Sequence, residues 1–282
     1  MPAHHLTSRS WHQYNIVFAG QETGERVAAR CLLPALAAGQ AGGTMDRWWY
    51  IRKQPAWRFR YLRPPGPGLR ELLDQLAMRR EITSWTPGIY EPETTAFGGP
   101  QAMRAAHLLF HHDSRHLLTS AAGQAAPGPG RRETSVLLGA ALLRAAGLDW
   151  YEQADVWAKV GALRAGAGSL AAGREAQLMP AMHRLLTVST CALRHSADRL
   201  AGDPDEWVIA FERAGQTMAS LAAAGRLRRG LRAVLAHHII FHANRAGLPV
   251  RDQSILAALA ASTTFETTPG AVFLPGAHPA DS

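Results

Sequence analysis

Two arginines alternate with aromatic residues in the run Trp57-Arg58-Phe59-Arg60-Tyr61. If this run is a β-strand, Arg58 and Arg60 share one face and are rooted about 7 Å apart, because side chains on a strand alternate. Two guanidinium groups at this spacing can clamp a carboxylate through paired hydrogen bonds. The run therefore predicts either a binding site for an anionic group or an ordinary solvated sheet face.

Histidines concentrate near the C-terminus, in the run from His237 to Arg245. His238 and His242 are four residues apart, so they share one helix face, and Arg245 lies beside them. Histidine titrates near neutral pH, which suits it to general acid–base catalysis. The chain has no GxSxG motif, and neither cysteine has a catalytic signature. The cluster predicts proton transfer, unless its histidines are simply buried and bonded to carbonyl groups.

A third group of reactive side chains begins at Tyr90, in the segment YEPETTAFGGP, and continues through His107 to Ser114. The pair Gly98-Gly99 before a helix start could present N–H groups to an anion. The segment lacks the GKS ending of a P-loop and the GxGxxG pattern of a dinucleotide fold, and its histidines form no HExxH motif. We therefore expect neither a metal nor a cofactor.

The elements that must position these residues follow from periodicity and from Gly and Pro punctuation. Strands are expected at 11–18, 47–52, 56–61 and 81–90, the last with a turn or bulge at Thr86-Pro87-Gly88. Helices are expected at 24–36, 69–80, 101–118, 134–146, 151–165, 180–200, 205–224, 227–246 and 251–261. Pro34 should kink or end the first helix, with a loop at Ala38–Gly43 after it. The fold class is α+β: a small N-terminal antiparallel or mixed sheet packed against a helical majority.

The domain organisation is expected to be simple. Residues 1–262 should form one domain, with a Gly/Pro/Ala-rich mobile loop at 121–131. The last residues, 263–282, contain three prolines and should form a disordered tail. We find no internal repeat.

The net charge of +8 comes almost entirely from arginine, because Lys53 and Lys159 are the only lysines. This excess reflects either an acidic partner or the codon usage of an Ala/Gly/Pro-rich chain. The densest run, Arg226 to Arg232, has no interleaved aromatic residue, so we do not expect direct nucleic-acid binding. The sequence contains no apolar stretch of membrane-spanning length and no secretory signal. Two cysteines suit a reducing compartment, and we expect a cytoplasmic protein.

In this order, the segments resemble the C-terminal elimination domain of lantibiotic dehydratases. They resemble more closely its free-standing form, the thiopeptide-type bacteriocin biosynthesis protein. The match runs from Trp11 to about Ala261. The residues that carry it are Trp48-Trp49-Tyr50-Ile51-Arg52, Trp57-Arg58-Phe59-Arg60, Tyr90-Glu91-Pro92-Glu93, Phe97-Gly98-Gly99, His107, Phe110, Asp113-Ser114 and Asn244-Arg245-Ala246-Gly247-Leu248.

The resemblance implies an enzyme that acts on a ribosomal precursor peptide and removes glutamate from glutamylated Ser or Thr, leaving dehydroalanine or dehydrobutyrine. A separate subunit would glutamylate the peptide from glutamyl-tRNA, and the resemblance also allows a homodimer. The implied catalytic residues are Arg58, Arg60, Tyr90, Glu93, His238 and His242. The implied substrate-binding residues are Arg52, Trp57, His107, Asp113, Asn244 and Arg245.

Two departures from the family pattern keep other functions open. Ala96 stands where eliminating members carry an arginine, and Ile240 stands where they carry a catalytic histidine. The related thiopeptide pyridine synthases perform a formal [4+2] aza-cycloaddition of two dehydroalanines and then expel water and the leader peptide. Such an enzyme would need acid–base groups such as Tyr90, Glu93 or His238. A third alternative is a non-catalytic partner that binds the precursor peptide, for example by strand addition at a sheet edge.

Overall fold

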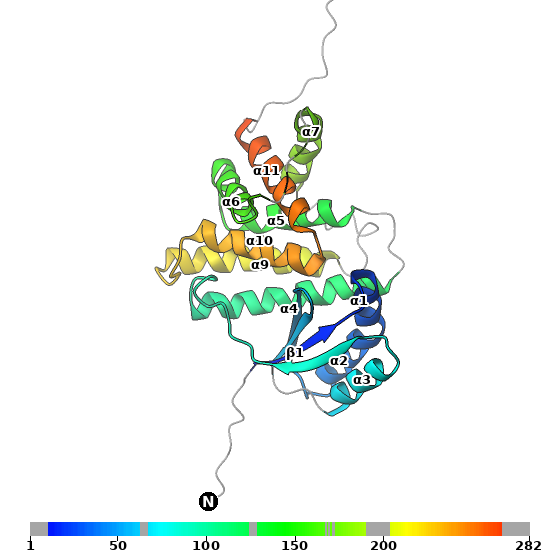
Figure 1. Ribbon diagram of the computed structural model, residues 1–282. Coiled ribbons are helices and arrows are strands. Elements are labelled where there is room, and N and C mark those ends of the chain that lie inside the picture. Colours follow the sequence, from blue (N-terminus) through cyan, green and yellow to red (C-terminus); the bar gives the residue numbers. More distant parts are fainter. Residues whose placement is uncertain are drawn as a thin grey trace, which may run out of the picture.

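The N-terminal part of the chain folds around one four-stranded antiparallel sheet (Figure 1). The computed structural model describes residues 11–62, 67–123, 129–166, 168, 170, 173–189 and 204–266. The strands are β1 (Trp11–Val17), β2 (Arg47–Arg52), β3 (Trp57–Leu62) and β4 (Ser84–Gly88), in the order β2-β3-β1-β4. The expected hairpin is β2–β3, with Tyr50 opposite Phe59. The α+β prediction is confirmed, and the sheet is wholly antiparallel.

Alternation along β2 and β3 gives the sheet two different faces. Trp48, Tyr50 and Phe59 belong to a core formed with the N-terminal helices. Those helices are α1 (Gln21–Val27), the π-helical turn Ala28–Leu32, α2 (Leu33–Ala41) and α3 (Pro67–Met78). Trp49 and Ile51 point the other way and belong to the core of the C-terminal helices. Arg58 and Arg60 share this second face, so the sheet presents its arginines toward the helical part.

The structure corrects two predictions near prolines, the loop at Ala38–Gly43 and the turn or bulge at Thr86-Pro87-Gly88. The first helix does not end near Pro34: α2 continues to Ala41, through most of the expected loop. The π-helical turn precedes the proline, and the Leu33 N–H bonds the Ala28 carbonyl five residues back. Residues Thr86-Pro87-Gly88 form no turn but belong to β4, which pairs with β1. Pro87 is tolerated because β4 is an edge strand.

The remaining helices stack on one side of a long central helix, α4 (Pro100–Ala122), with the sheet on the other side (Figure 1). They are α5 (Arg131–Ala145), α6 (Trp150–Ala162), α7 (Arg174–Thr187), α9 (Pro204–Ala223), α10 (Leu231–Ala246) and α11 (Val250–Glu266). Helix α7 starts six residues before the predicted position, and residues 190–200 of that prediction lie outside the described residues.

Helix α11 corrects the predicted tail at its beginning. It extends to Glu266, and Thr263 and Thr264 are buried. Residues 267–282 lie outside the described residues, as do residues 124–128 of the expected loop. Among the described residues, no helix combines the length and hydropathy needed to cross a bilayer.

Helix α4 lies along the outer edge of β2 and bonds two of its backbone groups. The Ser114 hydroxyl accepts the Tyr50 N–H at 3.1 Å, and His111 Nδ1 bonds the Trp48 carbonyl at 2.9 Å. The unpaired N–H and C=O groups of an exposed edge strand can pair with another chain. Here side chains of α4 bond two of these groups. Strand addition at Trp48 and Tyr50 of β2 is therefore blocked, and β4 is the other edge strand of the described sheet.

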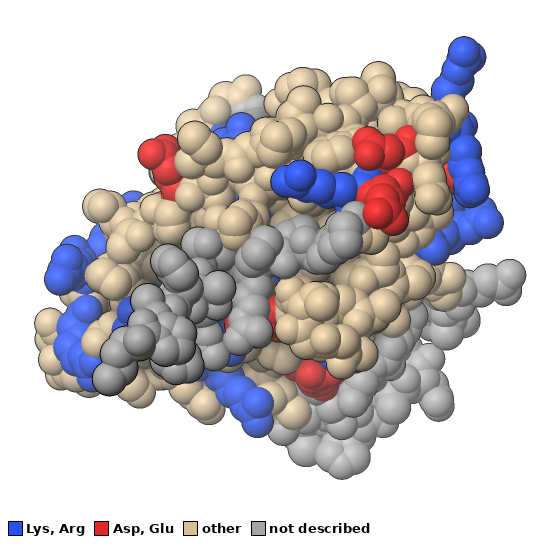
Figure 2. All heavy atoms as spheres, turned by 90° about the horizontal axis from the view of Figure 1, so that it is seen from below, with Lys and Arg blue, Asp and Glu red and all other residues tan. Residues whose placement is uncertain are grey.

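Basic side chains are dispersed on the face seen in Figure 2. Lys and Arg lie mainly around its rim, separated by tan surface, and acidic residues lie next to some of them. The salt bridges Arg132–Asp252 and Arg232–Asp155 show the same local pairing. A nucleic-acid surface would instead need a continuous basic stripe.

Candidate functional site

A half-open pocket of about 250 Å³ lies where the second face of the sheet meets α10. The β2–β3 hairpin contributes Ile51, Arg52, Lys53 and Arg60, and the segment before α4 contributes Glu93. The segment after α6 contributes Leu163 and Arg164, and α10 contributes His237, Ile240, Phe241 and Asn244. Basic side chains outnumber the single carboxylate in this lining. The pocket is suited to a ligand with anionic or strongly polar groups.

Arg60 forms a rigid cationic part of the pocket wall. Its side chain is 5% exposed, and its guanidinium carbon lies 4.3 Å from the ring centres of both Trp49 and Tyr90. Its Nε donates to Gln13 Oε1 at 2.8 Å. Burial lowers the pKa of Arg60 to about 10, so the group stays charged at neutral pH. Arg58 is half-buried on the same face of β3 but does not line the pocket.

Tyr90 and Glu93 lie next to Arg60. The Tyr90 hydroxyl is 2.7 Å from His107 Nε2, and the His107 ring packs on Trp11 at 4.5 Å. Burial, with a smaller contribution from Arg60, lowers the pKa of His107 to about 4, so this ring is neutral at pH 7. Burial also raises the pKa of Tyr90. The pair thus offers a phenol that keeps its proton until a reaction requires it.

The face of α10 that lines the pocket differs from the predicted one. His237, Ile240 and Asn244 line it, whereas His238 and His242 lie on the adjoining, buried face. The His237 ring bonds the Ala233 carbonyl at 3.1 Å, and its pKa is lowered by burial. His238 lies among aromatic rings, 5.0 Å from the ring of Phe97, and neither of its nitrogens has a partner among the described residues.

Asp113 is the centre of a buried polar network that ties α4 to three other helices. It accepts hydrogen bonds from His242 Nδ1 at 2.9 Å, Arg245 Nε at 2.7 Å and Trp207 Nε1 at 2.9 Å. His242 Nε2 continues the network to the Ser135 hydroxyl at 3.0 Å. Burial alone would raise the pKa of Asp113, but His242 and Arg245 lower it to about 2. The sequence placed Asp113, His242 and Arg245 in the site; the structure brings them together with one another, away from the pocket lining.

Arg52 and Trp57, both predicted to bind substrate, make contacts that hold the fold together. Arg52 lines the pocket, but its Nε donates to the Arg245 carbonyl at 2.7 Å and its Nη1 pairs with Glu25. Trp57 stacks on Tyr50 at 5.0 Å in the N-terminal core, outside the pocket lining. Arg52 therefore joins the sheet to the C-terminus of α10 as well as bordering the pocket.

The pocket residues that sequence reasoning missed come from the β2–β3 hairpin (Ile51 and Lys53), from the segment after α6 and from α10. Leu163 and Arg164 follow α6 in a segment without any motif, so no local signal could have identified them. His237 could have been found, because it is three residues before Ile240, the position that the family pattern marks. Among the described residues, no group of three or more His, Cys, Asp or Glu is arranged to hold a metal ion.

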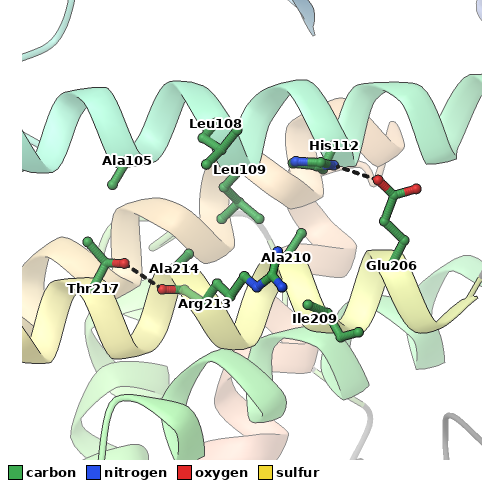
Figure 3. A pocket seen from close by; sticks show the side chains of 10 residues that line it. All are labelled: Ala105, Leu108, Leu109, His112, Glu206, Ile209, Ala210, Arg213, Ala214 and Thr217. Atoms are coloured by element: carbon green, nitrogen blue, oxygen red, sulfur yellow. Dashed lines mark hydrogen bonds and ion pairs between the residues drawn. The ribbon is translucent and has the colours of Figure 1, made fainter.

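A second, smaller hollow of about 90 Å³ lies between α4 and α9 (Figure 3). Its floor is apolar, with Leu109 and Ala210, and its rim carries His112 and Glu206, whose Nδ1 and Oε1 atoms are 3.4 Å apart. It shares no lining residue with the larger pocket. The convergent charged groups make the larger pocket the candidate functional site.

Comparison with known proteins agrees with this architecture. The model of the family "Lantibiotic biosynthesis dehydratase C-term" matches residues 11–264. No match to a curated protein was found.

Three solved structures share the fold. The tRNA-dependent lantibiotic dehydratase MibB from Microbispora sp. 107891 is 17% identical, with a TM-score of 0.62 over 92% of this chain; the chain spans only 28% of MibB. TsrL is 16% identical, with a TM-score of 0.64 over 91% of this chain and 95% of TsrL. The pyridine synthase TbtD from thiomuracin biosynthesis is 16% identical, with a TM-score of 0.57 over 91% of this chain and 98% of TbtD. Sheet, central helix and helical stack are thus shared, and the protein belongs to the lantibiotic dehydratase C-terminal family.

Proposed function

We propose that this protein modifies a ribosomally made precursor peptide at the pocket between the sheet and α10. We further propose that the reaction is the formal [4+2] aza-cycloaddition of two dehydroalanines, followed by loss of water and of the leader peptide. No metal or cofactor is required by this chemistry.

The identity of residue 240 carries the choice of reaction. Ile240 lines the pocket at the position where the family resemblance puts the histidine of eliminating enzymes. Ala96, where the resemblance puts an arginine, has no charge to offer, and its carbonyl accepts a hydrogen bond from Arg229 at 2.8 Å. Two groups that glutamate elimination would use are therefore replaced by apolar ones. Glu93 and His237 line the same pocket as Arg60, and Tyr90 packs against Arg60 from outside the pocket lining.

These remaining groups suit the proton transfers of the cycloaddition. One dehydroalanine must first become a 2-aza-diene, in which the proton of its amide nitrogen moves to the carbonyl oxygen of the preceding residue. After ring closure, proton donors must assist the departure of water and of the leader amide. We assign proton acceptance to Glu93 or His237, which line the pocket, and proton donation to the Tyr90 hydroxyl, whose ring packs against Arg60.

Glutamate elimination is the second candidate, and one observation favours it. Arg60, Lys53 and Arg164 leave the pocket with more positive than negative charge, and a glutamyl leaving group carries a carboxylate. The two reactions use different peptides, so they can be separated directly.

The test is mass spectrometry of products formed by the purified protein with two peptides. One peptide carries azoles and two dehydroalanines behind a leader sequence; the other carries a glutamylated serine. Release of the leader together with a macrocyclic core from the first peptide supports cycloaddition. Loss of glutamic acid from the second supports elimination instead. Tight binding of a peptide without either product would refute both reactions and leave the non-catalytic partner.

Arg60→Met should abolish the reaction that is found, because no other cation is held between two aromatic rings in the pocket lining. Arg144→Met is the control. Arg144 is also withdrawn from solvent, its guanidinium donates to the carbonyls of Leu186 and Val188, and it does not line the pocket. Equal loss of product in both variants would point to general destabilisation rather than to a role for Arg60.

A further inference from the structure

The side chain of Asn244 is held from behind by two residues that no motif marks. Asn244 lies on the pocket wall and is half-buried. Its Oδ1 accepts hydrogen bonds from Gln253 Nε2 at 3.0 Å and from Arg164 Nη2 at 3.4 Å. Gln253 belongs to α11 and is 4% exposed, and Arg164 follows α6. Three separate elements therefore meet at one amide.

The orientation of the Asn244 amide follows from which of its neighbours donate hydrogen bonds and which accept them. Arginine only donates hydrogen bonds, so the Gln253 atom that bonds Arg164 Nε at 2.8 Å must be its oxygen. A backbone carbonyl only accepts, so the Gln253 atom that bonds the Leu248 carbonyl at 2.8 Å must be its nitrogen. The Asn244 atom facing Arg164 and Gln253 Nε2 is consequently Oδ1. The two N–H groups on Nδ2 remain, and no described residue accepts a hydrogen bond from them.

We propose that Asn244 donates an Nδ2 hydrogen bond to a backbone carbonyl oxygen of the peptide substrate, and that Arg164 and Gln253 are the positioning residues that fix this donor. The inference rests on the proposed peptide-modifying function but not on the choice of reaction. In cycloaddition the acceptor is the carbonyl whose oxygen gains negative charge when a pocket base removes the amide N–H proton, before that oxygen takes up a proton to give the imidic acid. In elimination it is the carbonyl whose oxygen gains charge as the α-proton leaves. A donor fixed before the reaction stabilises either change without reorganising.

Contact with the peptide can be tested apart from turnover by NMR. The chain has only two asparagines, Asn15 and Asn244, so selective ¹⁵N-asparagine labelling gives two side-chain amide pairs. Asn15 does not line the pocket and serves as the internal reference. The ligand is the leader-bearing peptide with alanines in place of both dehydroalanines, which binds without reacting. We expect the Asn244 signals to shift at saturation while the Asn15 signals stay in place. Unshifted Asn244 signals in the complex would overturn the proposal.

Variants separate the donor role from a structural one. Asn244→Asp keeps an oxygen for Arg164 and Gln253 but loses the N–H donor, so kcat should fall about 100-fold while the protein stays folded. A purely structural Asn244 would tolerate this change, and an unchanged kcat would contradict the inference.

Gln253→Met should free the amide to rotate and lower kcat about tenfold with little change in KM. Its matched control is Gln153→Met: Gln153 is also buried, and its Nε2 also bonds the carbonyl five residues earlier, Leu148, at 3.0 Å. Only the first variant should alter the Asn244 signals in the bound state. If both glutamine variants lower kcat equally, the positioning role fails.

Different results would disprove the proposed reaction and the proposed Asn244 hydrogen bond. A protein that binds the unreactive peptide and shifts the Asn244 signals, but converts neither test peptide, disproves the proposed reactions and retains the hydrogen bond. A protein that converts a peptide while the Asn244 signals and the Asn244→Asp variant show no effect retains the function and disproves the hydrogen bond.

Discussion

A single step along α10 separates the pocket from the core. Successive helical residues are rotated by about 100°, so His237 lines the pocket while His238 points between Phe97 and Phe110. The histidine spacing in the sequence correctly places His238 and His242 together on one face but cannot say which face is buried. That choice depends on the packing of α4, α6 and β2 against α10, which one sequence does not contain.

At the residue scale, we therefore expect His237 and His238 to respond oppositely to substitution. His237→Gln should lower kcat about 100-fold if its imidazole transfers a proton. His238→Met should retain the wild-type kcat, because this ring lies outside the pocket lining among Phe97 and Phe110. Steady-state kinetics on whichever peptide is converted will decide. Loss of activity in His238→Met with unchanged stability would return the catalytic role to the sequence-predicted histidine.

At the element scale, the C-terminus of α10 is held by a cluster of polar side chains. The carbonyls of Arg245, Ala246 and Gly247 accept hydrogen bonds from Arg52, Arg131 and Gln21 respectively. Glu25 pairs with both arginines, and although burial raises its pKa, their charges lower it overall. Cations near a helix C-terminus also interact favourably with the negative end of the helix dipole. The cluster fixes α10 to β2 and thereby fixes the spacing of the pocket walls.

Gly247 gives a test of this attachment. Its φ is +75°, and an added Cβ would lie 2.5 Å from Arg52 Nη1. Gly225 is the control, since it ends α9 with a similar φ of +66° and has open space around it. The left-handed conformation alone should cost Gly225→Ala about 1 kcal/mol of stability. Gly247→Ala should cost more and also lower activity, because Arg52 must move. Equal losses of unfolding free energy in urea titrations would argue against the attachment.

Local pattern predicted the elements of the sheet better than the residues of the pocket. The alternation in Trp57–Tyr61 correctly gave Arg58 and Arg60 a common face, because strand periodicity needs no tertiary information. Arg164 and Gln253 each lie more than 100 residues after Arg60 in the sequence. Both belong to segments without motifs. They reach Asn244 only through the packing of α6 and α11, so their role could not be read from spacing.

At the scale of the whole molecule, α4 is shared by both hydrophobic cores. Its Leu118 belongs to the core under the sheet, and its Phe110 belongs to the core of the C-terminal helices. The buried histidines His107 and His111 lie on the same helix, and His238 packs against it from α10. Protonation of these rings would place charge inside both cores at once.

We therefore expect the protein to lose stability steadily on mild acidification. Burial lowers the pKa of His107 and His111 to about 4 and that of His238 to about 3, against about 6.5 in an unfolded chain. Between these values the unfolded state binds more protons, so the free energy of unfolding falls as the pH falls from 6.5 towards 4. Each histidine contributes a slope of about 1.4 kcal/mol per pH unit within this window. The shift of Asp113 acts only below about pH 4, because its folded-state pKa is about 2.

Urea denaturation at pH 7, 6 and 5 measures this slope, and His238→Met isolates one histidine. The variant should show a smaller loss of unfolding free energy between pH 6 and 5 than the wild type, because it has one fewer buried group to protonate. Its stability at pH 7 should change little, since the methionine fills a site already lined by Phe97 and Phe110. Parallel stability curves for the two proteins would mean that the His238 ring takes up its proton in the folded state, which is incompatible with the dry environment between those two rings.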